Sequence, residues 1–280
     1  MIFKEEISIK GSGKRPITFD VNYNPEMRNM PIALFCHGFK GFKDWGAWNL
    51  VAEKMAEAGI FFIKMNFSHN GVSVKNLNDI SDAEAFAENT FSLELDDLGL
   101  VLDWICKDNE EYKYYFNPEN ISVIGHSRGA PICLLKSIED DRIGKVITWA
   151  GAFNLGKFVE MEDDAAWQER GFVEVKNART GDVYPINYSF RKDYLDHAER
   201  LNLAKRIADF DQELMLIHGK DDETAPISNS RKIHEFVKHS VYLETNGNHT
   251  FGSSHPWTSE NLPTDLLKVM DETSEFVLLE

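Results

Sequence analysis

Short apolar runs alternate with amphipathic segments along most of this chain of 280 residues. Apolar runs that lack a polar face are typical of strands inside a parallel sheet, because crossover helices cover both faces of such a sheet. The runs lie at 31–36, 61–67, 120–127, 145–151, 213–219 and 240–245, and helical spacing occurs at 49–58, 91–105, 131–138 and 227–239. The sequence therefore predicts an α/β fold with a mostly parallel sheet and helices on both of its faces.

The N-terminal segment has a different pattern. Apolar and polar residues alternate from Ile7 to Ile9 and again from Ile17 to Val21, on either side of Gly11-Ser12-Gly13. Alternation around a glycine-containing turn predicts an antiparallel hairpin, which we expect at one edge of the sheet.

A long excursion interrupts the α/β alternation late in the chain. About sixty residues separate Gly151 from Asp211, where a single helix would be enough to connect two parallel strands. Within this excursion, 172–177 and 183–190 have the pattern of a hairpin. Because long connections often carry function, we expect a single domain over residues 1–280, with a cap insertion at about 152–210 that covers the site.

Charge and cysteine content exclude several classes of protein. Asp and Glu number 46 against 30 Lys and Arg, so the formal net charge is −16. This balance argues against nucleic acid and anionic membranes as partners. No apolar run approaches the ~20 residues that span a bilayer. The charged N-terminus does not resemble a secretory signal, and Cys36, Cys106 and Cys133 form no CxxC pair. We therefore expect a reducing, cytoplasmic location.

The motif Gly125-His126-Ser127-Arg128-Gly129 fits G-x-S-x-G and lies between a predicted strand and a predicted helix. In that context the glycines allow a sharp turn, which projects the Ser127 side chain at the carboxyl end of the sheet. The N-terminal amides of the following helix would then face developing negative charge. The alternative is a glycine-rich turn whose serine only caps the helix.

An acid and a histidine follow Ser127 in the order that a catalytic triad needs. Asp221 and Asp222 come after the run at 213–219, and His249 comes after the run at 240–245. Parallel strands end at the same edge of the sheet, so His249 could accept the Ser127 proton while a carboxylate orients its imidazole. A solvated loop histidine is the alternative for His249, but three parts in the correct order favour the triad.

These motifs together resemble the serine hydrolases of the α/β-hydrolase fold. His218 to Pro226 matches the acid loop HGxxDxxxP, and the resemblance implies that Asp222, not Asp221, is the acid. His37-Gly38-Phe39 matches the oxyanion loop, which implies that the backbone N–H groups of Phe39 and Arg128 form the oxyanion hole. The late cap, HGF and the GNHTF stretch at 247–251 are similar to the branch of dienelactone-hydrolase-like proteins and cinnamoyl (feruloyl) esterases.

The resemblance implies hydrolysis of a small carboxylic ester through an acyl-enzyme, without cofactor or metal. Packing of the cap onto the core explains most of the aromatic residues in the cap, although an aromatic-rich lid would also suit an apolar or aromatic acyl group. They are Phe153, Phe158, Trp167, Phe172, Tyr184, Tyr188, Phe190 and Tyr194. An acyl-aminopeptidase, a thioesterase or an acyltransferase would use the same triad, and a non-catalytic interaction protein would show a broken one. The oligomeric state stays open.

One further pattern resembles a metal site. His234 and His239 resemble an HExxH motif but lie five residues apart, which is ~500° of helix, so their rings do not share a face. We therefore expect no zinc site at this position.

Overall fold

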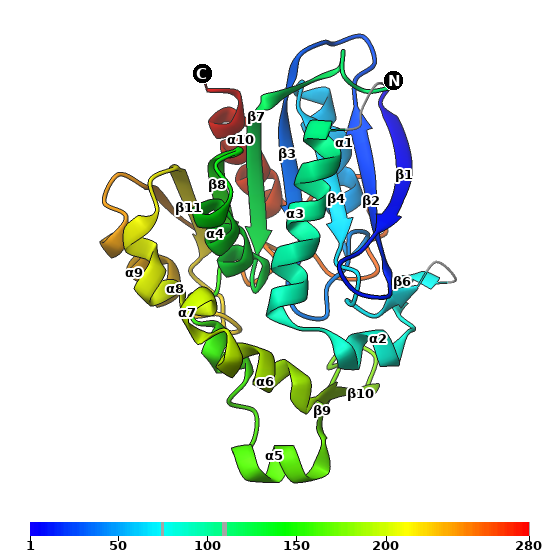
Figure 1. The fold of residues 1–280 in the computed structure, drawn as a ribbon. Coiled ribbons are helices and arrows are strands. Elements are labelled where there is room, and N and C mark those ends of the chain that lie inside the picture. The colour runs from blue at the N-terminus through cyan, green and yellow to red at the C-terminus, as the bar shows by residue number, and fades with distance from the viewer. Residues whose placement is uncertain (74–75, 108–110, 280) are drawn as a thin grey trace.

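The computed structural model describes residues 1–73, 76–107 and 111–279. Within these ranges, only the backbone is described at residues 77 and 78. Across the described residues, the central sheet has the strand order β1-β2-β4-β3-β7-β8-β11-β12 (Figure 1). The strands are β1 (Phe3–Lys10), β2 (Pro16–Tyr23), β3 (Met30–Cys36), β4 (Phe61–Asn66), β7 (Phe116–His126), β8 (Ile143–Trp149), β11 (Glu213–Gly219) and β12 (Val241–Thr245). β1 and β2 form an antiparallel hairpin at one edge, and β2 also runs antiparallel to β4. The other pairings are parallel, which confirms the predicted α/β class.

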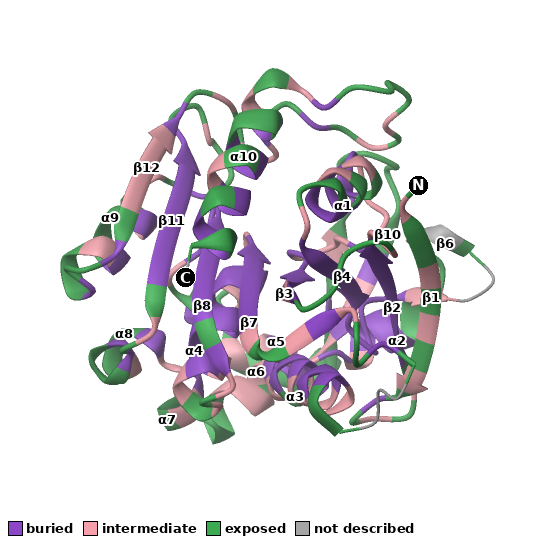
Figure 2. Ribbon diagram, turned by 90° about the horizontal axis from the view of Figure 1, so that it is seen from above, coloured by how far each residue is buried: buried purple, intermediate pink, exposed green. Residues whose placement is uncertain are grey.

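The central strands are buried on both faces, whereas β1 is mostly exposed (Figure 2). Successive residues of β3 belong alternately to two apolar clusters, as in Leu34 on one face and Phe35 on the other. This alternation follows from the pleat of a strand. It explains why these strands read as continuous apolar runs in the sequence.

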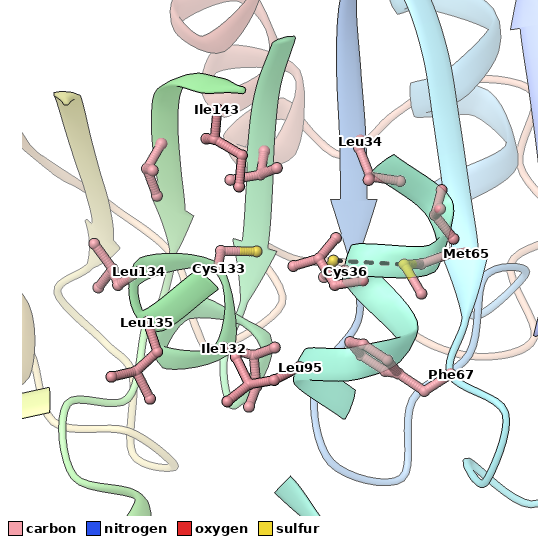
Figure 3. Close-up of a cluster of buried hydrophobic side chains, with 14 of the residues drawn as sticks. Leu34, Cys36, Met65, Phe67, Leu95, Ile132, Cys133, Leu134, Leu135 and Ile143 are labelled. Carbon is pink, nitrogen blue, oxygen red and sulfur yellow. Dashed lines mark hydrogen bonds between the residues drawn. The ribbon is translucent and has the colours of Figure 1, made fainter. Parts of the chain in front are cut away.

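Helices cover both faces of the sheet (Figure 2). The first cluster packs under α3 (Phe91–Lys107) and α4 (Gly129–Glu139), and the second under α1 (Trp48–Glu57) and α10 (Thr264–Leu278). In α3, Phe91, Leu95 and Leu98 are fully buried at helical spacing. Figure 3 shows the first cluster, in which Cys36 and Cys133 are buried free thiols.

The sequence analysis assigned no element to several segments that the structure shows as regular. One is α10, which buries Leu266, Val269 and Val277 against the second cluster. Others are β5 (Val72–Ser73), β6 (Asn76–Ile80) and α2 (Ala83–Glu88), which lie near the carboxyl ends of the strands (Figure 1).

Residues 152–210, here called the cap segment, connect β8 to β11 and lie largely beyond the carboxyl ends of the strands (Figure 1). Its elements are η1 (Leu155–Phe158), α5 (Asp164–Arg170), β9 (Phe172–Lys176), β10 (Val183–Asn187), α6 (Tyr188–Asp196), α7 (Ala198–Leu201), α8 (Leu203–Arg206) and η2 (Ile207–Asp209). β9 and β10 form the antiparallel hairpin that the sequence predicts, but the second strand ends at Asn187, and the predicted strand residues 188–190 are the start of α6. The remaining helix, α9 (Ser228–Phe236), lies between β11 and β12 in the chain.

No helix in the described ranges is both long enough and apolar enough to cross a bilayer.

Candidate active site

Ser127 lies at the sharp turn between β7 and α4 and has a φ of 55°. This left-handed conformation is uncommon for a residue with a side chain, so the surrounding turn must hold it in place. The Ser127 N–H donates to the carbonyl of Trp149 at 2.9 Å, and its carbonyl accepts from Ala152 N at 3.0 Å. A Cβ at Gly125 would lie 2.5 Å from the Cα of Ala130, so the turn has no room for a side chain there.

The structure brings Ser127, His249 and Asp222 into one hydrogen-bonded chain. His249 Nε2 is 2.9 Å from Ser127 Oγ, and His249 Nδ1 is 2.8 Å from Asp222 Oδ2. The Asp222 side chain is fully buried, and its Oδ1 accepts from the backbone N–H groups of Thr224 and Ala225 at 2.9 and 2.8 Å. Asp221 does not take part in this chain: its backbone N–H donates to Gly247 O at 3.1 Å.

A second histidine also contacts the Asp222 carboxylate. His218 Nε2 lies 3.2 Å from Asp222 Oδ2 and 2.8 Å from the carbonyl of Ala225. Burial alone would raise the pKa of the Asp222 carboxyl, but hydrogen bonds from His218 and His249 outweigh burial and hold that pKa well below its usual value. Asp222 is therefore ionised at neutral pH. The sequence analysis named His218 only as the first residue of the acid loop and missed this contact.

The loop that begins at His37 passes close to Ser127. A Cβ at Gly38 would lie 2.8 Å from Ser127 Cβ, so only glycine allows this approach. His37 Nδ1 is 2.9 Å from the carbonyl of Gly38, and its Nε2 is 3.2 Å from Asn70 Nδ2. Burial lowers the pKa of His37 to about 4, so at neutral pH the ring is uncharged and supports the loop through both nitrogens.

The N–H groups predicted to form the oxyanion hole belong to Arg128, which follows Ser127 in the chain, and to Phe39, which follows the closely approaching Gly38. Within the described residues neither N–H donates to another group. The Arg128 side chain turns away from Ser127, into the interior. It pairs there with the buried Glu94 carboxylate, and its guanidinium carbon lies 4.7 Å from the centre of the Phe39 ring. The Arg128 guanidinium therefore packs against the Phe39 ring from the interior of the fold and restricts the position of Phe39.

His126 contacts the loop that carries His249. Its Nε2 lies 2.9 Å from the carbonyl of His249, and the two rings are 4.9 Å apart. Burial, with His249 as a smaller cause, lowers the pKa of His126 to about 3. A neutral His126 therefore donates its Nε2 hydrogen to that carbonyl, which fits the expected role of a positioning residue rather than a base.

A cavity of about 260 Å³ opens beside Ser127 and His249. The loop after β3 and the start of α1 supply most of its wall, including Phe39, Lys40, Trp45 and Trp48. The cap segment supplies Asn177, Ala178 and Arg179, which follow β9. The sequence analysis missed Trp45, Trp48, Lys40 and Arg179, although the first three lie within ten residues of the predicted oxyanion loop.

None of the eight aromatic residues noted in the cap segment belongs to the lining of this cavity. Trp167 and Phe190 are instead almost fully buried in the first apolar cluster, and Phe172 is exposed. The cap aromatics therefore pack onto the core or face solvent. This agrees with the interpretation of these residues as packing residues and not as a lining for an acyl group.

Comparisons with known proteins identify the fold. No protein-family model matches the sequence, and no curated protein matches it. Among solved structures, Est1E from Butyrivibrio proteoclasticus has a TM-score of 0.71 over 98% of this chain and 97% of that chain, at 16% identity. The esterase domain of a Rhodothermus marinus protein has a TM-score of 0.65 over 98% and 97%, at 15% identity. An acylaminoacyl peptidase from Pyrococcus horikoshii has a TM-score of 0.65 over 98% of this chain but 41% of that chain, at 17% identity.

The chain has the α/β-hydrolase fold. In this fold Ser127, Asp222 and His249 follow β7, β11 and β12 respectively, so all three lie at the carboxyl edge of the sheet. The described residues contain no group of three or more His, Cys, Asp and Glu side chains placed to hold a metal ion.

Proposed function

We propose that this α/β-hydrolase protein cleaves carboxylic esters through a covalent acyl-enzyme on Ser127. The observation that carries the proposal is the continuous chain of hydrogen bonds from Ser127 Oγ through His249 to Asp222. A serine hydroxyl is a weak nucleophile unless an adjacent base removes its proton. The base in this proposal is His249, whose Nε2 lies 2.9 Å from Ser127 Oγ.

The reaction takes two steps at the Ser127 oxygen. In the first, Ser127 Oγ attacks the ester carbonyl carbon while His249 Nε2 takes the hydroxyl proton, and the alcohol then leaves with that proton. In the second, His249 takes a proton from water as the water oxygen attacks the acyl carbon, and His249 returns that proton to Ser127 Oγ as the acid is released. The ionised Asp222 accepts the Nδ1 hydrogen of His249 throughout, so it keeps the imidazole in the required tautomer and stabilises the imidazolium.

Negative charge develops on the carbonyl oxygen of the substrate as Ser127 attacks. Hydrogen-bond donors close to that oxygen stabilise this charge. We assign this role to the N–H groups of Phe39 and Arg128, because Arg128 follows Ser127, Phe39 follows the closely approaching Gly38, and neither N–H has another acceptor among the described residues. The N-terminus of α4, which begins at Gly129, adds its dipole to the same charge.

Amide hydrolysis is the second candidate, because the fold is shared with an acylaminoacyl peptidase. Est1E has also been solved with ferulic acid bound. A panel of aryl acetate, feruloyl ester, acyl thioester and aminoacyl-arylamide substrates separates these activities. Ester cleavage as the fastest reaction supports the proposal, and faster arylamide cleavage would replace it with the second candidate.

The test of the nucleophile is Ser127→Ala. We expect a loss of roughly 10⁶-fold in kcat with an unchanged circular dichroism spectrum. A fluorophosphonate probe should add one label to the native protein and none to the variant, as measured by intact mass. Ser259→Ala, at an exposed position, is the matched control and should keep full activity and labelling. A native protein that neither reacts with the probe nor cleaves any substrate would favour a non-catalytic interaction protein.

A further inference from the structure

Two cationic side chains line the cavity beside Ser127, and no acidic side chain among the described residues does. Asp221 and Glu223 line an adjoining pocket, which shares Arg179 and His249 with this cavity. Lys40 comes from the loop after β3, and Arg179 comes from the turn between β9 and β10, so they reach the cavity from different parts of the fold. This is notable in a chain whose formal net charge is −16. The remaining lining is neutral or aromatic, apart from the histidines His37, His126 and His249.

The Lys40 ammonium has no carboxylate partner within the described part of the chain. Its Nζ donates to the carbonyl of Lys176 at 3.1 Å and lies 5.4 Å from the centre of the Phe39 ring. Burial lowers the pKa of Lys40, because the ammonium has lost part of its hydration without gaining an opposite charge. An anion bound beside Lys40 would supply that missing charge.

Arg179 is held in place but keeps donors for a ligand. Its Nη2 lies 2.8 Å from Asp79 Oδ1, and 31% of its side chain is exposed. A guanidinium has five N–H donors in a planar fork, so one contact to Asp79 leaves others for a second acid group. Asp79 offsets part of the Arg179 charge, whereas no carboxylate in the described part of the chain offsets Lys40, so Lys40 keeps an unbalanced positive charge in the wall of the cavity.

We propose that the cavity takes esters that carry a second, ionised carboxylate, which Lys40 and Arg179 bind while Ser127 attacks the ester carbonyl. The proposal rests on the ester hydrolysis proposed above and specifies its substrate class. Phe39, Trp45 and Trp48 supply apolar surface in the same cavity for the carbon chain between the two acid groups. Charge-assisted contacts of this kind add selectivity because a neutral analogue cannot make them.

The test compares two esters of equal shape. One is the para-nitrophenyl monoester of adipic acid, and the other has its free carboxylate replaced by the carboxamide. A second pair places the same difference on the alcohol, with the acetate esters of para-hydroxybenzoate and para-hydroxybenzamide. Spontaneous hydrolysis is subtracted in each case. In the native protein we expect kcat/KM to be at least ~10-fold higher for the charged member of one pair, which corresponds to about 1.4 kcal/mol.

The variants Lys40→Met and Arg179→Met should each lower this preference by about threefold, and the double variant should abolish it. The readout is the ratio of kcat/KM between the charged and the neutral member of each pair, so a general loss of activity in a variant cancels. Lys40→Arg should keep most of the preference, since it keeps the charge. Lys268→Met removes one positive charge from an exposed position on α10 and should leave the preference unchanged. Added salt should weaken the native preference because the two cations are partly open to solvent.

Failure of the carboxylate site and failure of the proposed nucleophile give different results. A native protein that shows no preference for the charged member of either pair, or a preference that the Met variants leave intact, overturns the carboxylate site while ester hydrolysis stands. Hydrolysis that persists in Ser127→Ala overturns the proposed nucleophile instead. A preference seen only in the acyl pair or only in the alcohol pair shows which half of the ester carries the acid group.

Discussion

The loop that follows β3 and the turn that joins β9 to β10 both reach the cavity beside Ser127, but they are held in different ways. Lys43 and Asp44 in the loop join Asp20 of β2 and Lys64 of β4 in a cluster of alternating charges. The side chains of Asp20 and Lys64 are fully buried there. The turn at 177–182 has backbone hydrogen bonds of its own and the partly exposed Arg179–Asp79 pair.

This difference indicates which part of the site tolerates amino-acid substitution. Breaking a buried ion pair leaves an uncompensated charge in the interior, so the loop is fixed in one conformation. Partly exposed pairs contribute little to stability, so the turn can vary without unfolding the protein. We infer that the sheet edge and its loop supply the bond-breaking groups, while the turn adjusts which substrate enters.

The largest expected effect separates two neighbouring carboxylates at the sheet edge. Asp222→Asn should lower kcat by about 10⁴-fold, because the amide no longer fixes the tautomer of His249. Asp221→Asn should cost about tenfold or less, since its side chain lies outside the hydrogen-bonded chain. Steady-state kinetics on one aryl acetate measures both. Equal losses of kcat in the two variants would contradict the choice of Asp222 over Asp221 as the acid that orients His249.

The next prediction tests the rigidity of the loop. Gly38→Ala places a Cβ 2.8 Å from Ser127 Cβ and 3.2 Å from the His126 carbonyl, so the loop must move away from Ser127. We expect kcat to fall by about 10²-fold, the scale of a misplaced donor. Gly144→Ala is the matched control, because its Cβ would meet only Ile121 O at 3.8 Å. A fully active Gly38→Ala would show that the loop is adaptable.

The buried charge cluster predicts a pH-dependent stability. Burial alone would raise the pKa of Asp44, but Lys64 and Lys43 outweigh it and lower that pKa from 3.8 to about 2. A lowered carboxyl pKa stabilises the fold above the unfolded value near 4, and the effect disappears as the pH falls through about 2. Asp44→Asn should therefore lose about 2 kcal/mol of unfolding free energy at pH 7.

Urea denaturation of both proteins at several pH values measures this difference, which should shrink between pH 4 and pH 2. Asp271→Asn, at an exposed position on α10, serves as the control and should remain close to the native protein at every pH. A constant difference across the range would mean that Asp44 acts through its shape and not its charge.

The smallest expected effect belongs to the turn. Val183 pairs with Lys176, so a two-residue Asn-Gly connection can replace residues 177–182. Hydrolysis of a small neutral acetate should change by about threefold or less, since no group assigned to bond breaking is removed. The preference for charged esters should fall with the loss of Arg179. A large loss on the neutral acetate would contradict the division between edge and turn.

The sequence predicts the sheet edge well because the relevant signals there are local. The run at 213–219 is the observed β11, and the residues that follow β7, β11 and β12 are the predicted Ser127, Asp222 and His249. The lining of the cavity was not predictable in this way. Lys40 and Arg179 are brought together by packing between segments far apart in the chain, and no local pattern records that packing.

The cap aromatics illustrate the same limit. Trp167 and Phe190 are apolar residues in an insertion, and their sequence pattern is the same whether they enclose a cavity or fill a core. In the fold, the turn between β9 and β10 lies beside Ser127, so Asn177 and Arg179 line the cavity in place of the cap aromatics. The missed α10 does carry a local signal, because Leu266, Val269 and Val277 recur at helical spacing.

The place where the cap segment enters and leaves the chain has a consequence for the site. β8 and β11 are adjacent and parallel, with Lys145 opposite Glu213 and Trp149 opposite Ile217, although about sixty residues separate them in sequence. A parallel crossover needs only about a dozen residues, so most of this segment is free of the task of joining the strands. Parts of it, such as Trp167 and Phe190, still cover the first apolar cluster, whereas its exposed turn at 177–182 can change in length while the strand register is kept. Changes in this connection can therefore bring new side chains to the cavity while the sheet that positions Ser127 is left intact.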